Sequence, residues 1–173
     1  MARRFTLEES DDAFLSTAPR RYEHTIDIEA GPDAVWAALT ADDALVSWSR
    51  VITGMEWTSP RPFGVGATRT VTLGRLLQLD ERFYRWDEGE RMTFTVDAAS
   101  IPGLRRFAED IVLAPHAGGT RLAWTFALEG ELALRPLLAV AGPVNRLVTG
   151  TIASGTAHRV RHGSEAGNSC PPV

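Results

Sequence analysis

The stretch GVGATRTVTLG, residues 64–74, decides the fold, because its glycines open either a nucleotide-binding loop or a turn that leads into a strand. A dinucleotide fingerprint needs a strand before the glycines and, after them, a helix whose amino terminus holds the pyrophosphate. Here Gly66 is followed by ATRTVTL, in which β-branched side chains alternate as they do in a strand. The pattern therefore predicts a turn followed by a strand, and it argues against a nucleotide-binding enzyme.

The two faces of this strand differ in polarity, since successive side chains of a strand point to opposite faces. One face carries three threonines, which is typical of a surface in contact with solvent. The other face carries Arg69, Val71 and Leu73, and its apolar residues predict that it points into the protein. The sequence thus places one arginine on the inward face of a strand.

The next predicted strand, residues 76–86, offers this arginine a carboxylate partner. If the connecting turn has two residues, Arg69 lies opposite Asp80, whereas a turn of three residues places it opposite Glu81. We prefer the second register, because it also sets apolar residues of the two strands against each other. Either partner makes a buried guanidinium tolerable, since such a group needs a counter-charge and hydrogen bonds.

Upstream of this hairpin the sequence predicts one strand and two short helices. Residues 21–30 alternate as a half-buried strand does. Residues 31–39 place a proline at the first helical position and carry an apolar stripe. Thr40 and Asp43 have the spacing of a capping box, which predicts a second short helix that ends near Trp48.

Downstream, alternation and turn signals predict a meander of antiparallel strands. With the first strand they make seven, and the other six are residues 51–57, 67–73, 76–86, 91–96, 105–114 and 120–128. Residues 131–162 have helical periodicity instead. We expect Gly142-Pro143 to break or kink this helix, because proline lacks an amide donor and its ring clashes with the preceding turn. Gly150 and Gly155 are expected to weaken it further, by about 1 kcal/mol each relative to alanine.

This order of elements predicts an α+β protein in which a curved antiparallel sheet wraps around one long C-terminal helix. The chain of 173 residues suits a single domain, which we place at residues 20–162. We expect residues 1–19 to be a flexible extension and residues 163–173 a disordered tail. The sheet and the helix enclose a volume that is either filled by side chains or is a pocket.

Composition limits the partners and the compartment. The net charge of −4 gives nucleic acid no electrostatic attraction. No apolar run reaches the ~20 residues that span a bilayer, so we expect no stable membrane insertion. The single cysteine, Cys170, lies in the predicted tail, and a chain without a disulfide framework is typical of a reducing compartment. We therefore expect a cytoplasmic monomer or homodimer. Every basic residue other than histidine is arginine, which is typical of a protein from a GC-rich bacterial genome.

Motifs for cofactor chemistry are not evident in the sequence. The four histidines lack the spacing of metal ligands. Neither a phosphate loop nor a nucleophile elbow occurs. We therefore expect a protein that requires no cofactor.

Several motifs resemble the START-like (Bet v 1-like, SRPBCC) superfamily, in particular its polyketide cyclase/dehydrase and lipid-transport branch. These motifs are IEAGPDAVW at 28–36, GVGATRTV at 64–71, DER at 80–82 and GGTRLAW at 118–124. The resemblance spans about residues 20–162 and implies a helix-grip fold with a cavity between sheet and helix. Members of the superfamily bind lipids, hormones, polyketides or other flat apolar molecules, and a few catalyse aldol cyclisation and dehydration.

The stretch VGATRTV also resembles a strand of the plant abscisic-acid receptors. That likeness implies that Val71, Leu73 and Glu81 line the cavity, in agreement with the strand parity. Those receptors carry a long gate loop after this strand, whereas Gly74-Arg75 is short. The departure argues against a hormone receptor.

Strand parity, helical periodicity and the resemblance together predict the cavity wall. The candidate ligand-binding residues are Arg69, Val71, Leu73, Leu79, Glu81, Phe83, Phe94, Trp124, Phe126, Val144 and Val148. The first functional hypothesis is binding or transport of a small, largely apolar ligand, such as a lipid, a polyketide or an aromatic molecule. The alternative is a cyclase/dehydrase enzyme acting on a poly-β-ketone, with Glu81 as proton acceptor and Arg69 stabilising an enolate. A third hypothesis is a protein-interaction module that uses Trp57 or Trp48 at the surface, and no feature of the sequence favours it.

Overall fold

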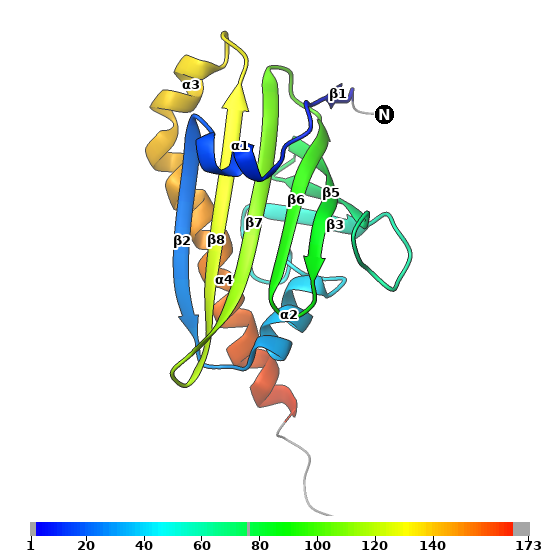
Figure 1. Cartoon of the computed structure of the whole chain (residues 1–173), viewed down its shortest axis with the longest axis vertical. Helices are drawn as coiled ribbons and strands as arrows, with labels where there is room; N and C mark the ends of the chain where they lie inside the picture. Colours follow the sequence, from blue (N-terminus) through cyan, green and yellow to red (C-terminus); the bar gives the residue numbers. More distant parts are fainter. Residues whose placement is uncertain (1–2, 76, 168–173) are drawn as a thin grey trace, which may run out of the picture.

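The computed structural model describes residues 3–75 and 77–167. Within these residues, eight strands form one antiparallel sheet (Figure 1). The strands are β1 (Phe5–Thr6), β2 (Arg20–Ile28), β3 (Ile52–Trp57), β4 (Thr68–Leu73), β5 (Leu77–Asp87), β6 (Arg91–Ala99), β7 (Leu104–His116) and β8 (Gly119–Gly130). The helices are α1 (Asp12–Thr17), α2 (Pro32–Thr40), α3 (Arg135–Val140) and α4 (Gly142–Gly167).

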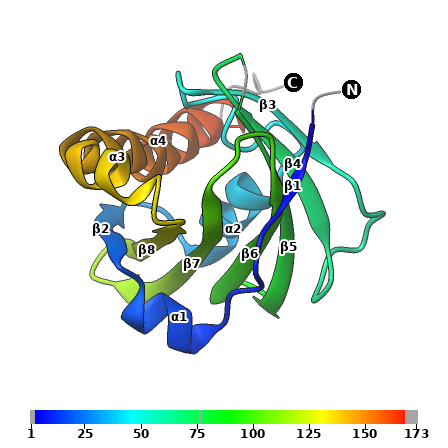
Figure 2. The same cartoon turned by 90° about the horizontal axis from the view of Figure 1, so that it is seen from above.

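The sheet is a curved meander that wraps around the C-terminal helix. Its strand order is β2-β8-β7-β6-β5-β4-β3, with the short β1 paired to β6. Figure 2, seen from above, shows the sheet curling so that α2 and α4 lie on its concave side. The core fills this side, with Trp124, Phe83 and Phe94 among its largest fully buried side chains. The predicted α+β helix-grip fold with seven meander strands is thereby confirmed.

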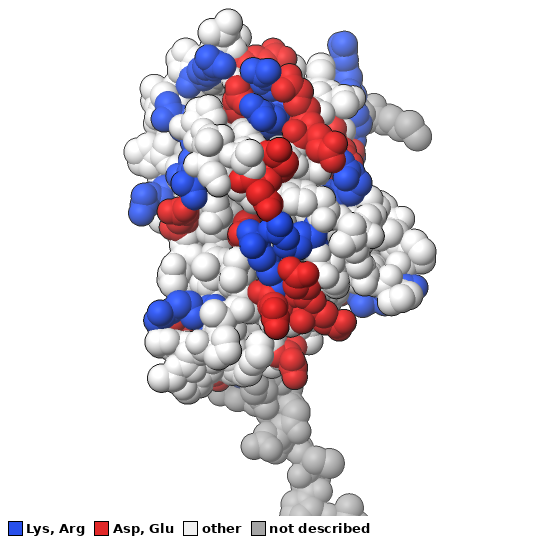
Figure 3. All heavy atoms as spheres, in the orientation of Figure 1, with Lys and Arg blue, Asp and Glu red and all other residues white. Residues whose placement is uncertain are grey.

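The convex face of the sheet carries many charged side chains, apart from an apolar patch on β7 and β8. Arginine and acidic side chains pair across neighbouring strands, as in Arg82 with Asp97 and Arg91 with Asp110. Figure 3 shows positive and negative side chains interleaved over this face. The contrast between the two faces explains the alternating pattern of the strands.

The GVGATRTVTLG stretch forms the predicted turn and strand. Gly66 has a φ of 89°, a left-handed conformation that glycine adopts without strain, and its N–H donates to the carbonyl of Phe83 at 2.7 Å. Strand β4 begins two residues later, so no helix terminus follows the glycines. The preferred register is confirmed, because Arg69 lies opposite Glu81 across β4 and β5. The threonines of the opposite face are half-buried.

Two local predictions near the N-terminus are wrong. The predicted flexible extension contains two ordered elements, since β1 pairs with β6 and α1 packs Phe14 and Leu15 against the convex face. Residues 41–48 form turns instead of a second helix. The Thr40 hydroxyl donates to the carbonyl of Trp36 and so does not cap a new helix.

The last segment has the predicted interruption. Helices α3 and α4 are separated at Ala141, although hydrogen bonds of α-helical spacing run from Ala141 N–H to the Leu137 carbonyl and from Asn145 N–H to the Ala141 carbonyl, both at 2.8 Å. Helix α4 extends to Gly167, beyond the start of the predicted tail at residue 163, and residues 168–173 lie outside the described part. None of the described helices is both long and apolar enough to cross a membrane.

The two glycines of α4 allow close contacts with neighbouring elements. A Cβ atom at Gly150 would lie 3.2 Å from the ring of His24 on β2. At Gly155 it would lie 2.1 Å from Cδ1 of Trp48. The Trp48 indole N–H donates to the carbonyl of Ile152 at 3.2 Å, which fastens the 41–48 turns to the helix. The low helix propensity of these glycines is therefore offset, because they allow α4 to pack closely against β2 and the 41–48 turns.

Candidate functional site

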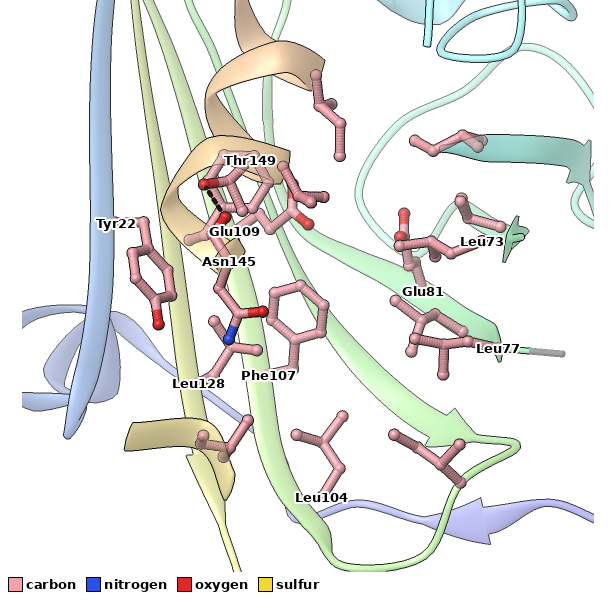
Figure 4. A pocket seen from close by; sticks show the side chains of 18 of the residues that line it. Tyr22, Leu73, Leu77, Glu81, Leu104, Phe107, Glu109, Leu128, Asn145 and Thr149 are labelled. Atoms are coloured by element: carbon pink, nitrogen blue, oxygen red, sulfur yellow. Dashed lines mark hydrogen bonds between the residues drawn. The ribbon is translucent and has the colours of Figure 1, made fainter. Parts of the chain in front are cut away.

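A cavity of about 380 Å³ lies between the concave face of the sheet and helices α3 and α4 (Figure 4). Its wall is mainly aliphatic and aromatic, because the alternating strands direct their apolar side chains toward the helix. Three basic or acidic side chains interrupt this wall, namely Arg69 on β4, Glu81 on β5 and Glu109 on β7. A largely apolar cavity with a few convergent polar groups is the usual composition of a small-molecule site.

Most of the predicted cavity residues do line this space. They are Arg69, Val71, Leu73, Leu79, Glu81, Trp124, Phe126 and Val148. The match follows from the strand register, because one correct pairing fixes the face of every residue in the hairpin.

Three predicted residues do not line the cavity. Phe83 and Phe94 point inward but are fully buried in a cluster of aromatic rings, where their centroids lie 5.0 Å apart. Trp57 and Trp86 pack on Phe83 and fill this end of the sheet. Val144 is 61% exposed on α4. The cavity-facing position is taken by its neighbour Asn145, which a search for apolar periodicity passes over.

Arg69 and Glu81 form a buried ion pair in the cavity wall. The Arg69 Nε donates to Glu81 Oε2 at 2.6 Å, and both side chains are at most 3% exposed. Three aromatic rings surround the guanidinium, with the Arg69 Cζ 5.0 to 5.4 Å from the centroids of Phe94, Phe83 and Trp57. Such contacts favour a cation in a site from which water is excluded. Burial raises the pKa of Glu81, and the charge and hydrogen bond of Arg69 counteract part of this effect.

Glu109 on β7 is a second buried carboxyl group beside the pair. Its Oε2 accepts the indole N–H of Trp124 at 2.8 Å. Burial, and next the nearby charge of Glu81, hold the pKa of Glu109 well above its ordinary value of 4.5. This environment favours the neutral, protonated acid. Strand parity places Glu109 on the inward face with Phe107, but the adjacent Asp110 makes the alternation weak, so it was not among the predicted site residues.

Polar groups also occur on the wall formed by β2 and α4. Tyr22 and Asn145 line the cavity there, and Figure 4 shows them on the side opposite Glu81. Thr149, one turn along α4, bonds through its hydroxyl to Nε2 of His24 at 2.8 Å. Sequence reasoning missed the polar groups of this wall, because isolated polar residues on a strand and a helix do not form a recognisable motif.

The comparisons with known proteins agree with this geometry. The family described as polyketide cyclase / dehydrase and lipid transport matches residues 19–162. The chain belongs to this family. The resemblance noted from the motifs is thereby confirmed. Among curated relatives, the uncharacterized protein Rv2574 of Mycobacterium tuberculosis is 36% identical over 135 residues, which cover 78% of this chain and 81% of that protein.

Solved structures of low sequence identity share the fold of this family member. TTHA0849 from Thermus thermophilus aligns with a TM-score of 0.71 at 17% identity, covering 83% of this chain and 99% of that one. The Zhui aromatase/cyclase from Streptomyces sp. R1128 aligns with a TM-score of 0.69 at 14% identity, covering 87% and 99%. A START superfamily protein from Mycobacterium smegmatis aligns with a TM-score of 0.64 at 15% identity, covering 82% and 97%.

Proposed function

We propose that this protein binds a small, largely apolar molecule in the cavity between its sheet and its C-terminal helices. The observation that carries the proposal is the cavity itself, about 380 Å³ in volume and walled mainly by aliphatic and aromatic side chains. Ligand sites commonly measure about 300 to 1,000 Å³. Membership of a family whose description includes lipid transport and polyketide cyclisation supports an apolar ligand.

The buried ion pair gives the ligand a defined orientation. Arg69 is held by Glu81 and by the surrounding rings, so its geometry is fixed before a ligand enters. A guanidinium carries several N–H donors, and only some of them are used by a single carboxylate. The Arg69 group is therefore suited to hydrogen-bond a ligand oxygen, while the aliphatic wall excludes water from the rest of the molecule.

The test of this proposal is native mass spectrometry of the freshly purified protein, together with a matched pair of variants. Val148→Phe places a ring into the cavity, whereas Val144→Phe adds the same ring at the exposed position one turn earlier. We expect a bound small molecule in the wild type and in Val144→Phe, and at least a tenfold lower occupancy in Val148→Phe. Equal occupancy in both variants would show that the molecule binds elsewhere.

A second candidate function is a cyclase/dehydrase reaction in the same cavity. The specific observation in its favour is the pair of buried carboxyl groups, since Glu81 contacts Arg69 while Glu109 is held toward its neutral form. Carboxyl groups of unequal proton affinity can serve as base and acid in one site. In this reaction Glu81 would accept a proton, Arg69 would stabilise the enolate and Glu109 would donate a proton.

Turnover of a poly-β-ketone substrate distinguishes the enzyme from the carrier. If the reaction occurs, Glu81→Gln and Glu109→Gln should each lower kcat by about a hundredfold or more, because general acid–base catalysis contributes that factor. Binding of the substrate without turnover by the wild type supports the carrier. Turnover that is unchanged in both variants removes these residues from the mechanism.

A further inference from the structure

We propose that the ligand carries uncharged oxygen groups at both of its ends, separated by an apolar middle. This inference rests on the proposed function, because it describes the occupant of the same cavity. The observation that carries it is the hydroxyl of Tyr22, which lies on the wall opposite the Arg69–Glu81 pair. The cavity is thus apolar in its middle, with Tyr22 at one end and the Arg69–Glu81 pair at the other.

The Tyr22 hydroxyl is buried without a hydrogen-bond partner in the described part of the chain. The side chain is only 7% exposed and lines the cavity from β2, and its hydroxyl oxygen lies 4.0 Å from the place that a Cβ atom at Gly142, the first residue of α4, would take. A buried hydroxyl that lacks a partner destabilises the protein, so such groups are rare in folded proteins. A ligand oxygen that enters the cavity would supply the missing bond.

Asn145 completes this polar end from the helix. Its side chain lines the cavity and is drawn beside Tyr22 and Phe107 in Figure 4. The backbone carbonyl of Asn145 accepts a hydrogen bond from the Thr149 hydroxyl, and the side-chain amide faces the cavity. An amide offers both donors and an acceptor, and a phenol offers one donor and an acceptor. This end therefore suits a hydroxyl or a carbonyl oxygen, neither of which brings a charge.

The other end lies on strands far from β2 in the sheet order. Arg69 is on β4 and Glu81 on β5, while Tyr22 is on β2 at the opposite edge, and curvature brings these walls to face each other. The guanidinium and the Glu81 carboxylate cancel in charge, and the Glu109 environment favours a neutral acid. A carboxylate of the ligand would have no free counter-charge in this space, because Glu81 already pairs with Arg69, so the structure disfavours an anionic ligand. Phe107 and Leu128 line the apolar region between the ends.

A matched series of flat probes tests this arrangement. The probes are trans-stilbene, its mono-para-hydroxy derivative and its para,para′-dihydroxy derivative, which differ only in having oxygen at neither, one or both ends. In the wild type, the dihydroxy probe should bind about fivefold to tenfold more tightly than the monohydroxy probe, which is the usual value of one additional hydrogen bond. In the Tyr22→Phe variant the difference in affinity between these two probes should be clearly smaller than in the wild type, because only Asn145 remains to bond the second hydroxyl.

Tyr84→Phe is the matched control, because Tyr84 is the other tyrosine and its hydroxyl contacts Asp12 outside the cavity. It should retain the wild-type ratio. The ligand-free Tyr22→Phe protein should melt no lower than the wild type, since it loses a hydroxyl that makes no bond within the described residues. An unchanged probe ratio in Tyr22→Phe overturns this inference alone. If the wild type binds none of the three probes, the proposed function fails as well.

Discussion

Removing one charge of the buried Arg69–Glu81 pair should lower the free energy of unfolding, and the size of this loss tests the description of the site. Both side chains are at most 3% exposed and are joined by a 2.6 Å hydrogen bond. Removing one partner of a buried pair leaves an uncompensated charge and typically costs about 3–5 kcal/mol. For a domain of this length, that cost lowers the melting temperature by about 6–20 °C. Replacing both residues by apolar ones of similar volume leaves no charge behind, and such exchanges are often neutral or stabilising.

The two single variants should differ in their dependence on pH. In Arg69→Met the remaining Glu81 can take up a proton, whereas in Glu81→Leu the remaining guanidinium stays charged throughout the accessible range. The pKa of Glu81 is already raised by burial. We therefore expect Arg69→Met to recover stability as the pH falls, while Glu81→Leu does not.

Urea unfolding of the wild type, both single variants and the double variant Arg69→Met/Glu81→Leu measures these effects as a double-mutant cycle. Tryptophan fluorescence is a suitable signal, because Trp57 stacks near the Arg69 guanidinium. The reasoning is refuted if either single variant loses less than about 1 kcal/mol, or if the double variant loses the sum of the two single losses.

Two further predictions concern the second carboxyl group and the helix glycines. The pKa of Glu109 in the folded protein is raised well above its ordinary value of 4.5, so the wild type loses stability as the pH rises from 4.5 toward the folded-state pKa. Glutamine cannot ionise, so we expect Glu109→Gln to be more stable than the wild type at pH values above 4.5. Urea unfolding at about pH 5 and about pH 8 should show the gain in stability of the variant widening by up to ~1.4 kcal/mol per pH unit. Gly155→Ala should lower the melting temperature, because the new Cβ atom would collide with Trp48. In Gly142→Ala the new Cβ atom would lie no closer than 4.0 Å to any other residue, so the higher helix propensity of alanine should raise the melting temperature. Equal effects at both glycines would contradict the contact argument.

Much of the fold could be predicted because its signals are local. The alternation of the 67–73 strand, together with matching of apolar pairs, was enough to place Arg69 opposite Glu81. Glycine and proline marked the turn before β4 and the interruption at Ala141. In each of these places, local propensity and the final packing favour the same structure.

The parts that could not be predicted depend on contacts between distant segments. Helix α1 is ordered because Phe14 packs on the convex face of β7 and β8, which its own sequence does not reveal. Strand parity correctly predicts that Phe83 points inward, yet Trp57 of β3 and Trp86 of the same strand pack on its ring and fill that space. Tyr22 and Asn145 line the same cavity because α4 packs against β2, and this packing has no counterpart in the order of the residues.

The docked glycines of α4 determine which side chains the helix presents to the cavity, although neither glycine lines the cavity. Gly150 meets His24 and Gly155 meets Trp48, and five residues place these contacts about 140° apart around the helix axis. Two such contacts set both the rotation of α4 and its distance from the sheet. A larger side chain at either position would turn or lift the helix and so exchange the residues presented by its inner face. Under the proposed function, ligand preference is thus partly encoded where the helix contacts β2 and the 41–48 turns, and substitutions there can change it without touching the bound molecule.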